Sequence, residues 1–181
     1  MTDTSSPLAP AAGSDAPRTV AGIRRLVWLA LRLAWHGRAL WHRIARPLTM
    51  GVRAVILDGP EDARRILLIR HSYIGGWHLP GGGVNRGETV ADAVRREVRE
   101  EVGLSVDGPV RLLGVYARFA AGASDHVSVF VAEGWSGTLA ADGVEIVEAR
   151  FFPLAALPAD VTRGTRRRLG ELAGAPRAEE W

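Results

Sequence analysis

Three glutamates stand close together on one strongly patterned segment of the chain. Glu97, Glu100 and Glu101 are spaced i, i+3 and i+4, so on a helix their carboxylates lie at neighbouring surface positions. Like charges at this spacing destabilise an isolated helix by roughly 0.2–0.5 kcal/mol per pair. A hard cation such as Mg²⁺ or Mn²⁺ binds carboxylate oxygens and keeps waters and substrate phosphate oxygens in its other positions. The segment alone is also compatible with a solvated helix face that carries ordinary ion pairs.

A glycine-rich loop precedes these carboxylates. The loop contains Leu79-Pro80-Gly81-Gly82-Gly83 and is closed by Gly87-Glu88. Glycines let backbone amides and carbonyls approach a ligand without an intervening side chain, although a tight turn alone would also explain them. The loop and the three carboxylates together indicate a metal–phosphate site.

The segment from Thr89 to Val102 is predicted to be the helix that positions the glutamates. Thr89 and Asp92 have the spacing of a capping-box-like start, with Asp in place of the usual Glu or Gln. Gly103 suits the left-handed position that ends a helix. The apolar residues at intervals of three and four are expected to form its buried stripe: Ala91, Val94, Val98 and Val102.

The spacing of the loop and helix residues resembles a complete Nudix box. Five residues separate Gly82 from Glu88, seven more lead to Arg96, and the chain then reads REVREEVGL as far as Leu104. The resemblance implies an α/β fold of the Nudix type, an α/β/α sandwich around a mixed sheet. It also implies an enzyme in which a water activated by Mg²⁺ or Mn²⁺ cleaves the diphosphate bond of a nucleoside diphosphate linked to another group.

The same resemblance implies roles for single residues. Metal ligands would be Glu97, Glu100, Glu101 and the Gly81 carbonyl, with Glu97 also a general base. Arg96 would hold a glutamate by an ion pair, and Gly82, Glu88 and Gly103 would be structural residues of the box. Some members use a further carboxylate before a late aromatic strand, and here Glu145 is favoured over Glu148 as that metal ligand.

Substrate contacts are expected outside the box. Arg70, Tyr73 and Trp77 could supply base stacking and phosphate contacts, although Trp77 also suits a buried loop anchor. His71, His78 and His126 could also contact substrate, but each is expected rather to be a surface or loop residue. ADP-ribose hydrolases of the family have a characteristic proline after the box, and dinucleoside polyphosphate hydrolases have a characteristic tyrosine. Residues 119–122 occupy these positions here, and they include neither a proline nor a tyrosine.

Three functional hypotheses stay open at this point. The first is hydrolysis of a nucleoside triphosphate or a nucleotide sugar. The second is hydrolysis of a lipid-linked or other non-nucleotide diphosphate at a membrane surface. The third is a sensor that binds nucleotides without hydrolysis, which the presence of all three box glutamates disfavours.

The remaining pattern predicts one domain built on strands. A hairpin is expected from residues 52–57 and 66–70, further strands at 110–119, 127–133 and 146–152, and a last helix at 162–172. Strands with a helix between them and another at the end indicate a mixed sheet covered on both faces. The Nudix domain is predicted to span 48–175.

The N-terminal part has a different composition. Residues 1–17 are predicted to be a disordered tail, and residues 18–47 a basic amphipathic helix that contains no Asp or Glu. Its apolar face would pack on the domain, mediate homodimerisation through residues 18–46, or lie at a membrane surface. Its uncharged runs are too short to cross a bilayer.

The composition limits the class of protein further. The 181 residues are 47% hydrophobic and 24% charged, which excludes a fully disordered chain, a collagen and a multi-span membrane protein. Without cysteine there is no disulfide, thiolate metal site or Cys nucleophile, and a cytoplasmic location, with peripheral membrane contact as the alternative, is predicted. The net charge of +3 is too small to indicate sequence-specific nucleic-acid binding.

Overall fold

A five-stranded mixed sheet is the centre of the described chain, which comprises residues 48–120 and 123–181 of a computed structural model. Its strand order is β4-β5-β1-β2-β7, with β1 and β5 parallel and the other neighbours antiparallel. The strands are β1 (Leu48–Asp58), β2 (Arg65–His71), β4 (Val110–Ala120), β5 (Ala123–Ala132) and β7 (Ile146–Pro153). A two-stranded sheet pairs β3 (Leu104–Val106) with β6 (Trp135–Gly137).

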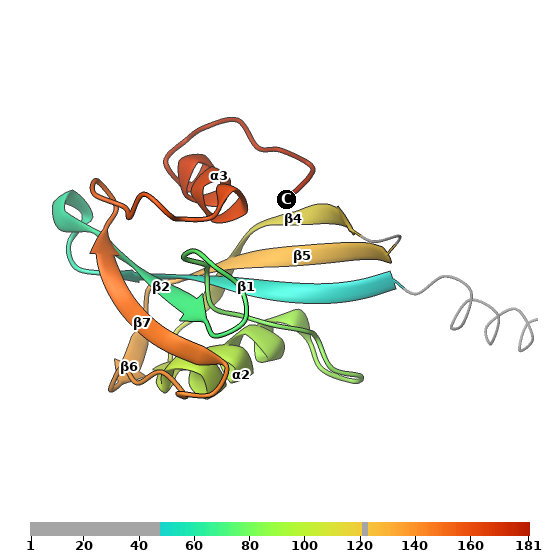
Figure 1. Cartoon of the computed structure of the whole chain (residues 1–181), viewed down its shortest axis with the longest axis horizontal. Coiled ribbons are helices and arrows are strands. Elements are labelled where there is room, and N and C mark those ends of the chain that lie inside the picture. Colours follow the sequence, from blue (N-terminus) through green and yellow to red (C-terminus); the bar gives the residue numbers. More distant parts are fainter. Residues whose placement is uncertain (1–47, 121–122) are drawn as a thin grey trace, which may run out of the picture. The chain divides into compact units, whose positions relative to one another are not determined.

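Two helices cover opposite faces of the sheet (Figure 1). Helix α2 (Val90–Val102) lies on one face and α3 (Arg163–Leu172) on the other, and a short 3-10 helix, η1 (Glu61–Ala63), connects β1 to β2. Successive side chains of a strand point to opposite faces, and β1 follows this rule. Val52, Ala54 and Ile56 pack in the core that contains the α2 residues, whereas Val55 and Leu57 pack in the core that contains Leu169 of α3.

This architecture confirms the predicted α/β/α sandwich with a mixed sheet. The hairpin, the three later strands and both helices of the domain lie where the sequence pattern predicts them, although β5 begins at Ala123 rather than at Val127. Strands β3 and β6 were not predicted, because three residues each are too few to show a period.

The predicted tail at 1–17 and basic helix at 18–47 lie outside the described residues. The hypotheses of homodimerisation and of membrane contact through residues 18–46 lie outside them as well. In the described part of the chain, no helix is long and apolar enough to cross a membrane.

The glycine loop is held by the first half of β1. Strand β1 pairs with β2 near its C-terminal end, at Leu57 and Asp58. Further toward the N-terminus, the amide of Val52 donates to the Gly82 carbonyl at 2.9 Å and the amide of Ala54 donates to the Pro80 carbonyl at 2.8 Å. The loop therefore lies against the sheet with its backbone fixed, directly before the helix that carries the glutamates.

Candidate active site

Helix α2 begins and ends where its capping residues predict. The Oγ1 of Thr89 accepts a hydrogen bond from the Asp92 amide at 3.1 Å, as expected of an N-cap. Gly103 has a φ of 71° and its amide donates to the Arg99 carbonyl at 3.1 Å. The buried face differs from the predicted stripe, because Ala93 is fully buried while Ala91 is only half-buried.

Arg96 joins the glycine loop to the acidic helix. Its Nε donates to Glu88 at 2.8 Å, and its Nη1 donates to Glu97 at 2.7 Å and to Glu100 at 3.0 Å. Its Nη2 donates to the carbonyl of Gly83 at 2.9 Å. One guanidinium thus holds three carboxylates and a loop carbonyl, which fixes Glu97 and Glu100 relative to the loop.

Glu88 anchors the end of the loop. One of its oxygens also accepts a hydrogen bond from the Asn85 amide at 3.0 Å. The hydrogen bonds from Arg96, followed by the one from Asn85, lower the pKa of Glu88 to about 2. The carboxylate therefore stays charged, and bound to Arg96, over the whole neutral and mildly acidic range.

Glu101 is the buried member of the three glutamates of α2, since Glu97 is half-buried and Glu100 is exposed. Glu101 is 5% exposed, and its Oε2 accepts a hydrogen bond from the Gly81 amide at 2.6 Å. Burial raises the pKa of Glu101 to about 8, against the opposing effect of that hydrogen bond. Gly81 has a φ of 134°, and a Cβ there would overlap the Val52 carbonyl oxygen, so this approach to Glu101 requires glycine.

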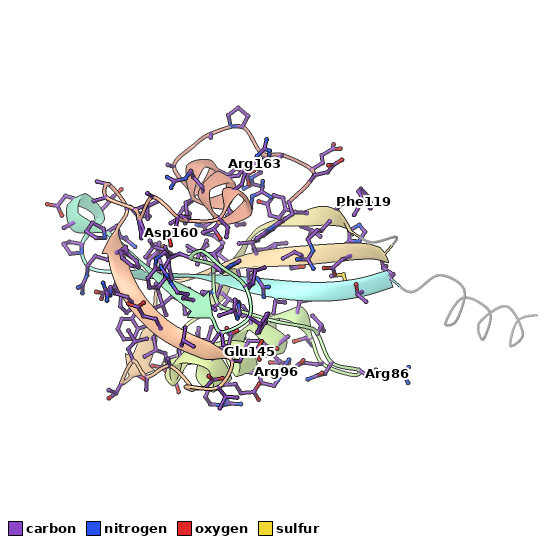
Figure 2. The ribbon with its side chains drawn as sticks, viewed as in Figure 1. Arg86, Arg96, Phe119, Glu145, Asp160 and Arg163 are labelled. Carbon is purple, nitrogen blue, oxygen red and sulfur yellow. The ribbon has the colours of Figure 1, made fainter. Side chains whose placement is uncertain are left out.

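The structure brings Glu101 together with His71 and Glu145. One possible ligand atom from each of these residues lies within 4.8 Å of the others. Glu145 stands just before β7, beside α2 (Figure 2), and its Oε1 accepts a hydrogen bond from the Tyr73 hydroxyl at 2.7 Å. Among the described residues, no other group of three His or acidic side chains has ligand atoms this close together. Glu97 and Glu100 do not belong to this group; both accept hydrogen bonds from Arg96 instead.

The loop that carries Glu145 is tightly bonded. The Oδ1 of Asp142 accepts hydrogen bonds from the amides of Val144, Glu145 and Ile146 at 2.8, 3.0 and 2.8 Å. These bonds lower the pKa of the Asp142 carboxyl. The Asp142 amide in turn donates to the Glu101 carbonyl at 3.3 Å, so the loop is tied to the end of α2.

His71 is buried, contrary to the expectation of a surface or loop residue. It ends β2 and is 8% exposed. Its Nδ1 has no hydrogen-bond partner among the described residues. Burial, together with the nearby His78 and Arg53, lowers the pKa of His71, which favours the neutral imidazole.

A hollow of about 270 Å³ borders the glycine loop. Arg53 of β1 and Arg118 of β4 contribute to its wall, together with Gly82 and Asp125. Arg118 pairs with Asp125 at 3.2 Å, whereas the one hydrogen bond of the Arg53 side chain to a described residue goes to the Val52 carbonyl. Burial lowers the pKa of Arg53 despite the opposing field of Glu101. Because it has no carboxylate partner among the described residues, the Arg53 guanidinium is suited to bind an anion in the hollow.

The three residues predicted to contact substrate have different environments. Trp77 is 4% exposed and packs edge-on against Phe152, with ring centroids 4.7 Å apart, as expected of a loop anchor. Arg70 pairs with Asp160 at 2.8 Å and lies over the Trp77 ring. Tyr73 is 69% exposed, and its hydrogen bond to Glu145 raises its pKa to about 12.

The donor set suits a divalent metal ion. Glu101 and Glu145 supply carboxylates, and the Gly81 carbonyl accepts no hydrogen bond from the described residues, so it is free to serve as an oxygen ligand. Oxygen ligands of this kind suit Mg²⁺ and Mn²⁺. A metal beside a hollow with a half-buried guanidinium is an arrangement that can bind and cleave a diphosphate.

Sequence reasoning missed Arg53 and the grouping of His71 with two carboxylates. Arg53 is the one charged residue in the apolar run from Val52 to Leu57, and that isolation was a usable signal. His71 directly follows the buried strand from Ile66 to Arg70, but nothing local to it indicates that two acidic residues from distant segments lie beside it.

Known proteins resemble this chain in sequence and fold. The family model of the NUDIX domain matches residues 47–171. The chain is 36% identical to the 8-oxo-dGDP phosphatase NUDT18 of Mus musculus over 64% of this chain and 36% of that protein. It is 42% identical to an ADP-ribose pyrophosphatase of Methanocaldococcus jannaschii over 58% of this chain and 64% of that protein. The chain thus covers less than two thirds of the length of either relative.

A solved structure shows the same fold. The crystal structure of a MutT NUDIX hydrolase from Burkholderia pseudomallei has a TM-score of 0.62 and 32% sequence identity to this chain. The match covers 70% of this chain and 99% of that one.

Proposed function

Because the chain belongs to the Nudix family, we propose that it is a hydrolase that cleaves a diphosphate bond in a nucleotide, with Mg²⁺ or Mn²⁺ as cofactor. The observation that supports this most directly is the position of the glycine loop. It contacts Glu101 through the Gly81 amide, contacts Glu97 through Gly82, and borders the hollow that Arg53 lines. An anion site adjoining a set of metal ligands is what diphosphate hydrolysis requires.

Each group of the site has a part in the proposed reaction. Arg53 binds a phosphate of the substrate in the hollow and orients it. Glu101, Glu145 and the Gly81 carbonyl would hold the metal, together with Glu97 and Glu100 as the box resemblance implies. When bound, the metal neutralises charge on the diphosphate and lowers the pKa of a coordinated water.

Glu97 is proposed as the general base. It accepts a proton from the attacking water, whose oxygen forms a bond to one phosphorus while the bond from that phosphorus to the bridging oxygen breaks. Arg96 acts through Glu97 by holding its carboxylate, at 2.7 Å, in one orientation. Arg96 is therefore a positioning residue.

The proposed substrate contains a nucleoside diphosphate unit. The names of the two curated relatives share this unit, since 8-oxo-dGDP is a nucleoside diphosphate and ADP-ribose is one linked to a sugar. Nucleoside triphosphates and nucleotide sugars, the substrates expected from sequence, contain the same unit. Cytoplasmic nucleotides of this kind are the natural candidates to assay first.

The test measures phosphate and nucleotide release from a panel of nucleoside di- and triphosphates, ADP-ribose and nucleotide sugars, with Mg²⁺ or Mn²⁺. We expect Glu97→Gln to reduce kcat by about 10²- to 10⁴-fold, the usual contribution of a general base. The matched control is Glu61→Gln, in the exposed turn of η1, which should retain full activity. Lack of turnover on every nucleotide, with metal bound, would contradict the proposal and favour a lipid diphosphate or a sensor role.

A further inference from the structure

The end of β2 holds a buried histidine that the box resemblance gives no role. His71 is 8% exposed, and its buried Nδ1 has no hydrogen-bond partner among the described residues. A buried ring nitrogen without a partner is unfavourable, because its hydrogen bond to water is lost on folding and no hydrogen bond within the protein replaces it. A histidine that merely fills a core position would be expected to have such a partner.

The strand register directs this ring toward two carboxylates. Arg70 pairs with Glu148, but the next residue, His71, pairs with Ile146, so one residue of β7 is left over between them. Such an irregularity re-aims side chains and is common beside functional sites. Here it brings His71 next to the segment that carries Glu145, and the Ser72 amide donates to the Glu145 carbonyl at 2.9 Å.

The two carboxylates are held from other directions. Glu101 is fixed by the Gly81 amide at 2.6 Å, and Glu145 is fixed by the Tyr73 hydroxyl at 2.7 Å. The ligand atoms of the three side chains lie within 4.8 Å of one another. Donors bound at about 2.0–2.2 Å to a common ion lie about 2.8–4.4 Å apart, so the three side chains need only draw together around an ion to share it.

We propose that the imidazole of His71 is a nitrogen ligand of the divalent metal bound by Glu101 and Glu145, and that it makes the site favour a first-row transition ion such as Mn²⁺ over Mg²⁺. The inference rests on the proposed function, because it concerns the same metal site. Mg²⁺ takes oxygen ligands in a strict octahedral geometry. Imidazole nitrogen suits transition ions, so replacing one oxygen by nitrogen changes the preference in their favour.

The experiment uses the full chain with Mn²⁺ as the probe. Pulsed electron paramagnetic resonance detects the nitrogen nucleus of a directly bound imidazole, and selective ¹⁵N labelling of histidine separates that signal from backbone nitrogen. We expect an imidazole coupling in the wild-type chain, and its loss in His71→Phe. The matched control is His78→Asn, because the His78 ring lies 5.2 Å from His71 and its Nε2 already contacts the Gly75 carbonyl.

A second measurement compares the affinities for Mn²⁺ and Mg²⁺. Loss of the nitrogen ligand in His71→Phe should reduce the preference for Mn²⁺ by about 10- to 100-fold, the range seen when groups that support a metal are removed. The wild-type spectrum needs no variant, so the inference stays falsifiable even if His71→Phe does not fold.

The outcomes separate this inference from the proposed function. An imidazole coupling that His71→Phe abolishes and His78→Asn retains supports it. Bound Mn²⁺ and normal hydrolysis without any imidazole coupling would overturn the role of His71 and leave the hydrolase proposal standing. A coupling that disappears in His78→Asn instead would overturn it too. Failure to bind Mn²⁺ would overturn both.

Discussion

Gly82 and Glu97 are packed together as only a glycine permits: a Cβ at position 82 would lie 2.6 Å from both carboxylate oxygens of Glu97. That carboxylate cannot simply rotate away without loss, because Arg96 holds it at 2.7 Å. The contact links the loop to the proposed general base. It also explains in steric terms why the first residue of the box pattern is a glycine.

Gly82→Ala should therefore displace the Glu97 carboxylate while leaving the fold intact. A misplacement of about 1 Å can cost about 10²-fold in rate, and we expect a fall of that order in kcat. The measurement is steady-state hydrolysis at saturating metal, with the thermal midpoint recorded in parallel. Gly75→Ala is the matched control, since nothing lies within 4 Å of a Cβ there. Equal activity of the two variants would contradict the assigned role of Gly82.

Arg53→Met should weaken substrate binding. The guanidinium lies in the wall of the hollow and forms no ion pair with a described carboxylate. Removing it therefore breaks no ion pair among the described residues. A hydrogen bond to a charged group contributes about 1.5–3 kcal/mol, which corresponds to a loss of about 10- to 150-fold in kcat/KM.

Kinetics on the best nucleotide substrate would check this effect. Arg53→Lys, which keeps the charge but not the planar fork, should fall between wild type and Arg53→Met. Arg111→Met, at an exposed position of β4, is the control and should change nothing. If Arg53→Met kept its kcat/KM, the hollow would not be the phosphate site.

The helix and its caps were predictable because their signals are local. The spacing from Thr89 to Gly103 contains both ends of α2 and most of its buried stripe. The exceptions, Ala93 and Glu101, are buried at the face that the glycine loop and the sheet cover, which helical periodicity alone does not show. A short-range pattern predicts an element but not what packs on it.

The composition of the proposed metal-ligand group was less predictable because it is assembled from distant segments. His71 and Glu145 are 74 positions apart in the chain and meet through the pairing of β2 with β7. Their exact neighbours depend on a one-residue irregularity in that pairing. The register between two strands cannot be read from the spacing of residues along the chain. Glu145 was therefore favoured only through the family resemblance.

The ion pair between Glu88 and Arg96 should stabilise the chain in a pH-dependent way. The folded pKa of Glu88 is about 2, below its ordinary value of 4.5. A lowered pKa means that the stabilisation is fully present above about pH 4.5 and is lost as the pH falls toward 2. Glu88→Gln should therefore unfold at a lower temperature than wild type at pH 7. This difference in unfolding temperature, the gap between the two proteins, should disappear as the pH falls from 4.5 to 2.

Thermal unfolding in the presence of a chelator would measure this gap without a contribution from bound metal. Glu61→Gln, in the exposed η1 turn, should show no comparable gap at either pH. A difference between wild type and Glu88→Gln that stayed constant down to pH 2 would show that the carboxylate charge is not what stabilises the loop.

A buried ion pair on the other face of the sheet should affect stability far more strongly. Arg168 is fully buried and donates to Glu171 at 2.8 Å, while the Tyr116 hydroxyl donates to the second oxygen of that carboxylate at 2.7 Å. The Ala178 amide donates to Glu171 as well, at 3.0 Å. Removing one partner of such a pair leaves a buried charge without compensation, so Glu171→Ala should lower the free energy of unfolding by about 3–5 kcal/mol.

Replacing both partners should be much less harmful than replacing one, because no buried charge then remains. Arg168→Met combined with Glu171→Met is expected to recover most of the lost stability, measured by denaturant unfolding. Glu148→Gln breaks the exposed pair with Arg150 and should cost no more than about 1 kcal/mol. If the single Glu171→Ala variant were as stable as Glu148→Gln, the buried pair would contribute no more than a surface one.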